Sequence, residues 1–370
     1  MTMARVIIRN ASYDYKTLKP VFFELLDAIA GGKVKRGSRV LIKPNLLAPA
    51  SPDKAIVTHP LIIKAAAEYV LDKGAHPVIS DSPATGSFRK ILLESGIKNA
   101  LEGLDVEFCE FKKSVSIEAG KPFGKIEIAE EALNADLFIN LPKLKTHSQM
   151  LLTLGVKNLF GCVVGMKKPE WHLRAGADRE MFARLLVRIY QAVRPSVTII
   201  DGILGMEGQG PGRSGEPREI GIIAGSRDAA SLDIALCRML GIKPDKLLTN
   251  RFALEYGITD EEVEIEGVLP EIKDFKFPEI SSGMFGPKMF HRFMRRHLTQ
   301  RPVCNDKICK LCGECWKYCP AGAITSPEKR IYFNYDKCIR CYCCIEVCPH
   351  GALRTDQTVP GKIIRRCLKM

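Results

Sequence analysis

The chain has 370 residues, of which 46% are apolar and 26% are charged, and its formal net charge is +13. This composition is typical of a folded protein with enough apolar material for two domains. The first residues, MTMARVIIRN, lack the features of a signal peptide, and no window of about 18 uncharged apolar residues predicts a membrane span. We therefore expect a cytoplasmic protein with no transmembrane segment.

Residues 1–270 alternate Val- and Ile-rich apolar runs with amphipathic stretches of helical periodicity. Short buried strands that alternate with helices predict an α/β fold, a mostly parallel sheet with helices on both faces. Residues 105–111 and 124–133 are typical of an added hairpin or of a sheet edge. In chain order the main strands are expected at 5–10, 39–45, 76–83, 135–143, 196–202 and 219–225, and the helices at 21–32, 60–74, 88–96, 180–193 and 229–241.

Residues 271–303 form a basic linker in this interpretation, since three prolines interrupt them and the alternation of strands and helices weakens. Within the linker, residues 289–301 place aromatic and Met side chains on one face of a short helix and Arg side chains on the other. We expect this amphipathic helix to pack on the neighbouring domain. The alternative is peripheral contact with a membrane surface.

Eleven of the fourteen cysteines fall between Cys304 and Cys367. Eight of the eleven repeat the spacing C-x2-C-x2-C-x3-C-P, in which three thiolates hold one four-iron cluster and the fourth holds the other cluster. The alternative is a pair of zinc sites, but the tight triplets and the proline after each fourth cysteine argue against zinc. We assign one [4Fe-4S] cluster to Cys309, Cys312, Cys315 and Cys348, and the second to Cys338, Cys341, Cys344 and Cys319.

Residues 304–356 resemble the bacterial two-cluster ferredoxin domain, and we place a small α+β ferredoxin-like domain with a basic tail at 304–370. Cys304, Cys343 and Cys367 are left over, and we expect them to be small packing residues. Because Cys343 lies between two predicted ligands, its side chain should point away from the cluster that Cys344 holds.

Positive charge is concentrated at the C-terminal end. From Met284 to Met370 there are 17 Lys and Arg against 6 Asp and Glu, a net charge of +11. Each oxidised four-iron cluster with four thiolates adds about −2, so this region stays basic. We therefore expect an acidic redox partner protein. Nucleic acid is a disfavoured partner, because the charge lies on the cluster-binding region and no platform of aromatic residues accompanies it.

Unusual polar residues follow several predicted strands, where ligands bind in open α/β sheets. After Asp201, the last predicted strand but one is expected to open into the glycine-rich loop GILGMEGQGPGRSG. No G-x-G-x-x-G or G-x-x-x-x-G-K-[ST] motif is present, so the standard modes of dinucleotide and nucleoside triphosphate binding are unsupported. The candidate groups for holding a small anion or cofactor are Lys43, Asn45, Lys143, Lys145, Lys157 and Asn158. The candidate catalytic groups, as acids or bases, are Asp81, His147 and Asp201, with Glu207 as a further carboxylate. For His147 a purely structural role is an equal alternative.

The segments KPN, SDSP, LPKLKTH, GVKNLFG and DGILGMEGQGP, in this order, resemble the signature segments of domain-of-unknown-function family 362. The resemblance runs from about Arg39 to Leu240. Members of this family often carry a ferredoxin-type tail, so the resemblance implies an intracellular iron–sulfur protein. The resemblance implies that the loops containing these segments contribute to function, and it does not identify a substrate.

Our first hypothesis is an oxidoreductase in which two [4Fe-4S] clusters deliver electrons to a small anionic substrate or cofactor in a lysine-lined cleft. A flavin or a further metal would suit such a transfer, but no motif for either is found. The alternative is a non-catalytic electron-transfer protein whose α/β domain docks a partner enzyme. A nucleic-acid-modifying iron–sulfur enzyme ranks last.

Overall fold

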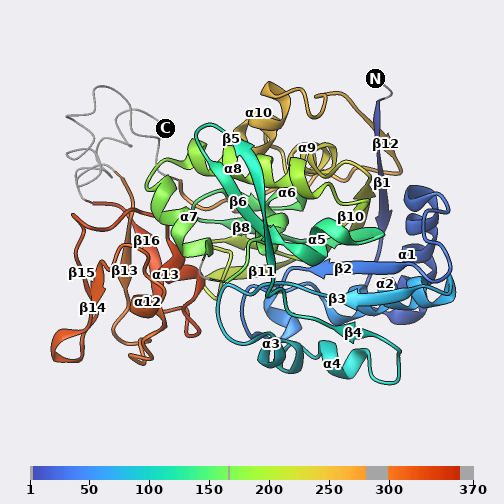
Figure 1. Ribbon diagram of the computed structural model, residues 1–370. Helices are drawn as coiled ribbons and strands as arrows, with labels where there is room; N and C mark the ends of the chain where they lie inside the picture. Colours follow the sequence, from blue (N-terminus) through green and yellow to red (C-terminus); the bar gives the residue numbers. More distant parts are fainter. Residues whose placement is uncertain (1–2, 166, 281–298, 359–370) are drawn as a thin grey trace.

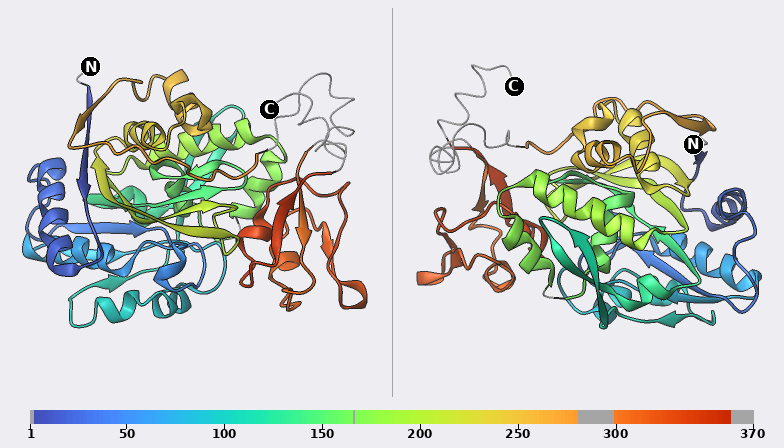
Figure 2. Two further views of the ribbon diagram at one scale, coloured as in Figure 1. Left: turned by 180° about the vertical axis from the view of Figure 1, so that it is seen from behind. Right: turned by 45° about the horizontal axis from the view of Figure 1, so that its top comes forward.

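The computed structural model describes residues 3–165, 167–280 and 299–358. Figure 1 shows two parts, a large α/β domain and a small cysteine-rich module of residues 299–358, which we call the cluster module. The cluster module packs against one end of the α/β domain, and the views of Figure 2 agree on this placement.

The α/β domain is built on one ten-stranded mixed sheet, which confirms the predicted fold class. Its strands are β1 (Ala4–Asn10), β2 (Arg39–Pro44), β3 (His76–Ile79), β4 (Glu107–Phe108), β7 (Leu137–Leu141), β8 (Lys143–His147), β9 (Leu151–Thr153), β10 (Val197–Gly208), β11 (Gly215–Ser226) and β12 (Val263–Glu266). The strand order is β12-β1-β11-β10-β7-β2-β3-β4, and β8 pairs with β10 and with β9. Strands β4, β3, β2, β7 and β10 run parallel, whereas β11 is antiparallel to both β10 and β1.

Helices cover both faces of the sheet (Figures 1 and 2). Side chains alternate between the faces along a strand: Val40 and Ile42 of β2 join the core under α1 and α2, whereas Leu41 joins the core under α8. Asp14, Asp178 and Asp228 begin α1, α8 and α9 by accepting backbone N–H groups of the first turn. The helices of the domain are α1 (Tyr15–Ala30), α2 (Pro60–Asp72), α3 (Phe88–Glu94), α4 (Ile97–Ala100), α5 (Glu130–Asn134), α6 (Gly155–Asn158), α7 (Lys167–Ala175), α8 (Arg179–Val193), α9 (Ala229–Met239) and α10 (Leu248–Glu255).

Strands β10 and β11 form an antiparallel ribbon that is longer than the sequence predicts. Their pairing runs from Thr198 and Ser226 to Gly208 and Gly215. The prediction that a glycine-rich loop follows residue 201 is therefore wrong for residues 202–208, which belong to strand β10. The glycines serve packing instead, because a Cβ on Gly205 would lie 2.7 Å from Ile220 Cδ1 on the neighbouring strand.

Residues 105–111 contain a sheet edge, and residues 124–133 contain one strand of a hairpin. Strand β4 is the edge strand beside β3, while β6 (Gly124–Ala129) pairs antiparallel with β5 (Ser114–Gly120) in a separate two-stranded sheet.

The cluster module is a small α+β unit. Strand β13 (Arg301–Cys304) pairs antiparallel with β16 (Leu353–Asp356), and β14 (Ile324–Thr325) pairs with β15 (Tyr332–Phe333). One short helix contains the third cysteine of each triplet, α12 (Glu314–Lys317) and α13 (Cys343–Glu346). The halves also repeat in the backbone: Leu311 and Arg340 have φ of 54° and 59° at equivalent positions. The duplication in sequence is thus a duplication in structure.

Two predictions fall largely outside the described residues. Of the amphipathic helix predicted for 289–301, residues 289–298 lie outside the described part of the chain. Strand β13 begins at Arg301. Cys367 and the basic tail from residue 359 onward also lie outside the described residues.

Candidate functional site

The cysteines of the cluster module gather into the two predicted sets. Cys309, Cys312, Cys315 and Cys348 line one small cavity. In the second set, burial raises the pKa of the Cys344 thiol, and the nearby Cys341, Cys338 and Cys319 act in the same direction. Four thiolates are the donor set of a [4Fe-4S] cluster. Within the described ranges no three His, Cys, Asp or Glu side chains are arranged to hold a single metal ion, so the ligand assignment stays a prediction.

Backbone N–H groups point at the sulfur of the fourth cysteine in each half. Ala323 N lies 3.3 Å from Cys319 Sγ, and Ala352 N lies 3.3 Å from Cys348 Sγ. Such N–H···S bonds stabilise negative charge on a thiolate and tune the reduction potential of the cluster that it holds. The residues therefore fit two four-iron clusters in chemistry as well as in spacing.

The turn between β10 and β11 docks the cluster module on the α/β domain. A Cβ on Gly212, in this turn, would lie 3.1 Å from the carbonyl oxygen of Glu346, so the turn approaches α13 closely. The glycine-rich segment thus helps to hold the cluster module. Three hydrogen bonds also join the two parts: Thr85 Oγ1 to Glu314 Oε2 (3.0 Å), Ser214 Oγ to Leu353 O (2.8 Å) and Thr355 Oγ1 to Gln209 Oε1 (2.8 Å).

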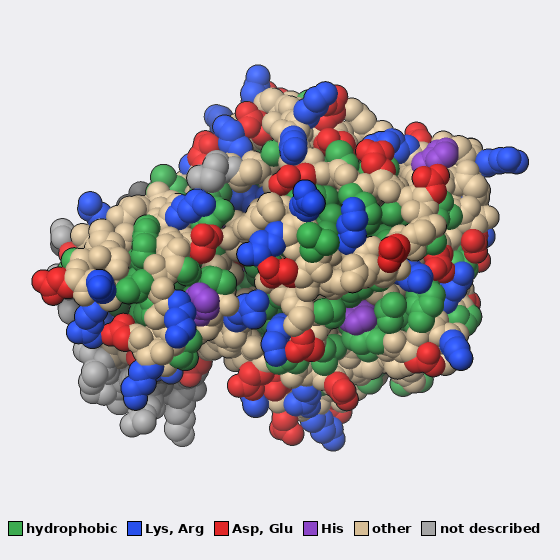
Figure 3. All heavy atoms as spheres, turned by 90° about the horizontal axis from the view of Figure 1, so that it is seen from below, with side chains coloured by type: hydrophobic (Ala, Val, Ile, Leu, Met, Phe, Trp, Pro, Cys, Tyr) green, Lys and Arg blue, Asp and Glu red, His purple; other side chains and the backbone are tan. Residues whose placement is uncertain are grey.

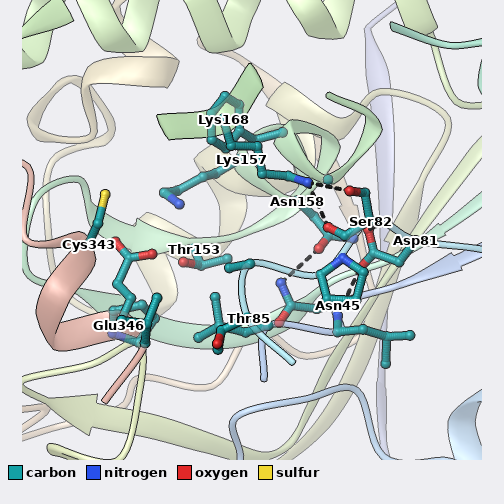
Figure 4. Close-up of a pocket in the computed structure, with 18 of the residues that line it drawn as sticks. Asn45, Asp81, Ser82, Thr85, Thr153, Lys157, Asn158, Lys168, Cys343 and Glu346 are labelled. Atoms are coloured by element: carbon teal, nitrogen blue, oxygen red, sulfur yellow. Dashed lines mark hydrogen bonds between the residues drawn. The ribbon is translucent and has the colours of Figure 1, made fainter. Parts of the chain in front are cut away.

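A cavity of about 280 Å³, which we call the interface cavity, lies at this junction (Figure 4). Seven of the nine predicted binding and catalytic residues of the α/β domain line it: Lys43, Asn45, Asp81, Lys145, His147, Lys157 and Asn158. The cluster module contributes Tyr318, Cys343, Glu346 and Val347. The predicted loops therefore converge, but the site lies between the two parts instead of within the α/β domain alone.

One end of the interface cavity is held by a buried ion pair. Lys43 Nζ lies 2.9 Å from Asp81 Oδ1, and both side chains are almost completely buried. Asp81 also accepts the backbone N–H groups of Leu46 and Ser82, each at 2.9 Å. These contacts occupy both Asp81 oxygens and fix the loop after β3 against the end of β2.

Lys145 is buried without a carboxylate partner among the described residues. Its Nζ donates to Asn45 Oδ1 (2.7 Å) and to the carbonyl oxygen of Ile56 (2.6 Å). Asn45 in turn donates to Asn158 Oδ1 (2.8 Å), and Asn158 donates to Asn140 Oδ1 (2.8 Å). Burial lowers the pKa of Lys145 well below its usual range. A chain of amides thus holds this amine in place, with no carboxylate paired to it to favour its charged form.

Helix α7 brings two further side chains to the interface cavity, Lys168 and His172, one turn apart on the same face. Lys168 Nζ donates to Ser82 Oγ (2.7 Å) and to the Ser82 carbonyl oxygen (2.8 Å). Burial lowers the pKa of Lys168 to about 7. The His172 ring stacks on Phe182 with ring centres 4.5 Å apart, and burial lowers its pKa to about 4. Neither residue is among those predicted from the sequence, although their spacing of four on one helix face is visible in it.

The buried Thr153 Oγ1 and His172 Nδ1, which line the interface cavity, have no hydrogen-bond partner among the described residues. Thr153 is 3% exposed and His172 is 6% exposed. Burial also lowers the pKa of Lys157, against the opposing effects of Glu346 and Cys343. Buried polar groups are normally hydrogen-bonded, so Thr153 Oγ1 and His172 Nδ1 are available to a ligand.

Glu346 of α13 meets His147 of β8 across the junction. His147 Nε2 lies 3.1 Å from Glu346 Oε1. His147 Nδ1 accepts the backbone N–H groups of Gln149 (3.1 Å) and Met150 (3.2 Å), so the proton of the neutral ring is on Nε2, facing the carboxylate. Burial lowers the pKa of His147 to about 4. Burial would raise the pKa of Glu346, but His147 and Lys157 bring it to about 2.

Lys143 and Asp201 are not among the residues that line the interface cavity. Lys143 Nζ lies 2.8 Å from Asp201 Oδ2 and donates to the Tyr13 hydroxyl (2.9 Å), which donates to Asp201 Oδ1 (2.7 Å). The backbone N–H of His59 donates to Asp201 Oδ2 (2.8 Å). Every polar atom of this group is used within it. Glu207 lies elsewhere, where it accepts the backbone N–H of Lys276 (3.2 Å).

The surface charge of the described cluster module is modest. Residues 299–358 contain 9 Lys and Arg against 6 Asp and Glu, so most of the basic excess lies in 281–298 and 359–370. Figure 3 shows basic and acidic side chains interspersed on the face seen from below. Two bound clusters would add about −4 to the module. Any attraction of an acidic partner therefore depends on the residues outside the described part.

Comparison with known proteins identifies both parts of the chain. The fold and the cysteine sets define an iron–sulfur protein with a ferredoxin-type electron-transfer module joined to an α/β domain. Residues 40–238 match the family called Domain of unknown function (DUF362), and residues 308–352 match the 4Fe-4S dicluster domain. The chain belongs to the DUF362 family, as the signature segments predict. The dicluster match supports iron–sulfur clusters over zinc.

Individual relatives cover different parts of the chain. It is 36% identical over 281 residues to the thylakoid-associated protein sll1697 of Synechocystis sp., covering 74% of this chain and 87% of that protein. Over 56 residues it is 36% identical to pyruvate synthase subunit PorD of Methanocaldococcus jannaschii, covering 15% of this chain and 65% of that subunit. The lactate racemase apoprotein of Thermoanaerobacterium thermosaccharolyticum is similar at 15% identity and a TM-score of 0.40, over 61% of this chain and 55% of that one.

The described residues include no helix long and apolar enough to cross a membrane. The relative from Synechocystis is named as thylakoid-associated, and the cytoplasmic location of this chain stays a prediction.

Proposed function

We propose that this protein is an oxidoreductase that passes electrons from two [4Fe-4S] clusters to a small anionic substrate or cofactor in the interface cavity. One observation carries the proposal. Helix α13 begins within the second cysteine triplet, and two of its side chains, Cys343 and Glu346, form a wall of a cavity that also contains Lys145 and Lys157. A ligand in this cavity would lie within a few bonds of a cluster ligand.

Bound clusters would supply single electrons, and the residues of the chain would bind the ligand, donate protons and exclude water. Lys157 would bind the anionic group of the ligand, with Thr153 and the amide-held Lys145 beside it. Lys168, hydrogen-bonded to Ser82, has a pKa of about 7 lowered by burial, which suits a proton donor near neutral pH. The walls of the cavity would exclude bulk water and strengthen these interactions.

Electrons would enter at the first cluster. Cys312 of the first set is exposed, and each set has two buried cysteines; in the second set Cys344 is adjacent to Cys343, which lines the interface cavity. These positions favour a path from the first cluster to the second. An external reductant, with the acidic partner protein as the proposed source, would therefore contact the surface around Cys312.

The test uses holoprotein purified without oxygen and characterised for iron, sulfide, flavin and metal content. Binding of small carboxylates and inorganic phosphate is followed by the electron paramagnetic resonance signal of the reduced clusters. We expect an anion to shift this signal in the wild type, and the Lys157→Gln variant to lose the shift. The Lys125→Gln variant removes the same charge from an exposed position of β6 that does not line the cavity, and should keep it. Equal responses of the wild type and Lys157→Gln would refute the proposal.

The alternative is a non-catalytic electron-transfer protein whose α/β domain docks a partner enzyme. The similarity to pyruvate synthase subunit PorD, which is confined to the cluster module, favours it. In that case Lys157→Gln and Lys145→Gln would leave electron transfer to the partner intact, and no anion would perturb the clusters.

A further inference from the structure

Cys343 stands apart from the other cysteines of the cluster module. It lies between Cys341 and Cys344 in the chain and is buried, and among the described residues it is the only cysteine that lines the interface cavity. In the chain it is two residues from Cys341 and adjacent to Cys344, both predicted ligands of the second cluster. Cys343 therefore contacts both the cluster-binding residues and the space where a ligand would lie.

Lys145 and Lys157 line the same cavity as the Cys343 thiol and can bind an anionic group of a ligand. Lys157 and Cys343 interact electrostatically, and Figure 4 shows the Lys157 amine and the Cys343 sulfur in the same part of the cavity, with the Glu346 carboxylate close to Cys343. The buried Thr153 Oγ1, which lines the same cavity, has no hydrogen-bond partner among the described residues. A metal ion suits the place poorly, because Lys145 and Lys157 repel a cation.

The size and the chemistry of the site narrow the class of ligand. A volume of about 280 Å³ lies at the lower end of small-molecule sites. A four-iron cluster exchanges one electron at a time, so a two-electron acceptor needs two transfers. A thiol in the site can hold the acceptor covalently between them, and the bond that a thiol exchanges reversibly is a disulfide.

We propose that Cys343 forms a mixed disulfide with a small anionic disulfide bound in the interface cavity. This inference rests on the proposed function, which supplies the electrons and the anion site. In the first step Cys343–SH and R–S–S–R give Cys343–S–S–R and R–SH. In the second step two electrons, one from each four-iron cluster, and two protons convert Cys343–S–S–R into Cys343–SH and a second R–SH. The net reaction reduces one disulfide to two thiols.

The experiment compares two disulfides of similar length and opposite charge, dithiodipropionate and cystamine. Oxidised, anaerobic holoprotein is incubated with each compound, and the peptide that contains Cys343 is analysed by mass spectrometry for the adduct. In parallel, reduced holoprotein is mixed with each compound and reoxidation of the clusters is followed by their visible absorbance. We expect the adduct and the reoxidation with dithiodipropionate, and a rate at least about tenfold lower with cystamine, because Lys145 and Lys157 repel the dication.

Two variants complete the test. Cys343→Ser should keep the full iron content and lose both the adduct and the fast reoxidation. Cys304→Ser replaces another cysteine that is not a predicted ligand and does not line the cavity, and it should behave as the wild type. Failure to find an adduct on wild-type Cys343, or fast reoxidation in an iron-replete Cys343→Ser protein, would overturn the inference. If no disulfide reacts while carboxylates or phosphate still act through Lys157, the proposed function stands and this inference fails alone.

Discussion

The group of Lys143, Asp201, Tyr13 and His59 provides a sharp test of whether these residues act structurally. Lys143 and Asp201 are both completely buried, and Asp201 accepts hydrogen bonds from Lys143, Tyr13 and the backbone of His59. Asp201→Ala leaves the Lys143 charge and two further donors unpaired in the core. Removing one partner of a buried ion pair costs about 3 to 5 kcal/mol, so we expect a loss of this size.

The measurement is urea unfolding of the anaerobic holoprotein, followed by far-ultraviolet circular dichroism. Glu107→Ala is the control, because it breaks the Arg39–Glu107 pair, which is equally short at 2.7 Å but about half exposed. An exposed pair contributes up to about 1 kcal/mol. The double variant Lys143→Met/Asp201→Leu should recover most of the stability that Asp201→Ala loses. Wild-type stability of Asp201→Ala, combined with a loss of redox activity, would contradict this reasoning and restore Asp201 as a catalytic candidate.

Three further predictions test the packing and the titration of buried groups. Gly161→Ala should destabilise the protein by about 1 to 3 kcal/mol in urea unfolding, because the new Cβ would lie 2.5 Å from Lys43 Nζ and displace the ion pair with Asp81. Burial lowers the pKa of His59 to about 4, so the unfolded chain binds this proton first and stability falls as the pH drops from about 6.5 to 4. His59→Asn keeps a cap for α2 and should reduce this acid-induced loss by up to about 3 kcal/mol; an unchanged pH profile would contradict it. Since Lys168 titrates near pH 7 in the folded protein and near 10.5 when unfolded, its contribution to stability rises with pH across that window. Lys168→Met should flatten the rise, whereas Lys167→Met, at an exposed neighbour, should not.

Periodicity and motif order were enough to predict the α/β class, the strand order along the chain and the loops that meet. These patterns gave a wrong prediction for glycine, which occurs both in loops and in closely packed strands. Glycines after Asp201 indicated a loop, yet Gly205 lies within β10 because a close cross-strand neighbour leaves no room for a Cβ. The antiparallel direction of β11 was also missed, because alternating strands and helices carry no signal for a hairpin inserted between two parallel segments.

Only the part of the site that lies in the α/β domain could be predicted from the sequence. Lys145, Lys157 and Asn158 stood out because polar residues after buried strands need an explanation, and the structure brings them together. Lys143 stood out for the same reason, yet it pairs with Asp201 outside the cavity, since side-chain direction at a strand end depends on which partners are in reach. Glu346 and Cys343 reach the interface cavity through the docking of the cluster module, and no local pattern in the sequence encodes that contact.

This docking links the charge of the clusters to the charge of the cavity. No carboxylate among the described residues forms an ion pair with Lys145 or Lys157, so an anionic ligand would stabilise the charged form of both side chains. An electron added to the second cluster would add negative charge beside Cys343, which also interacts electrostatically with Lys157. The anion and the electron therefore compete for the same positive charge. Because such coupling is reciprocal, a bound anion should lower the reduction potential of that cluster, and its reduction should weaken anion binding. A single lysine would then allow an anionic oxidised substrate to bind before the electron arrives and favour release of the product afterwards.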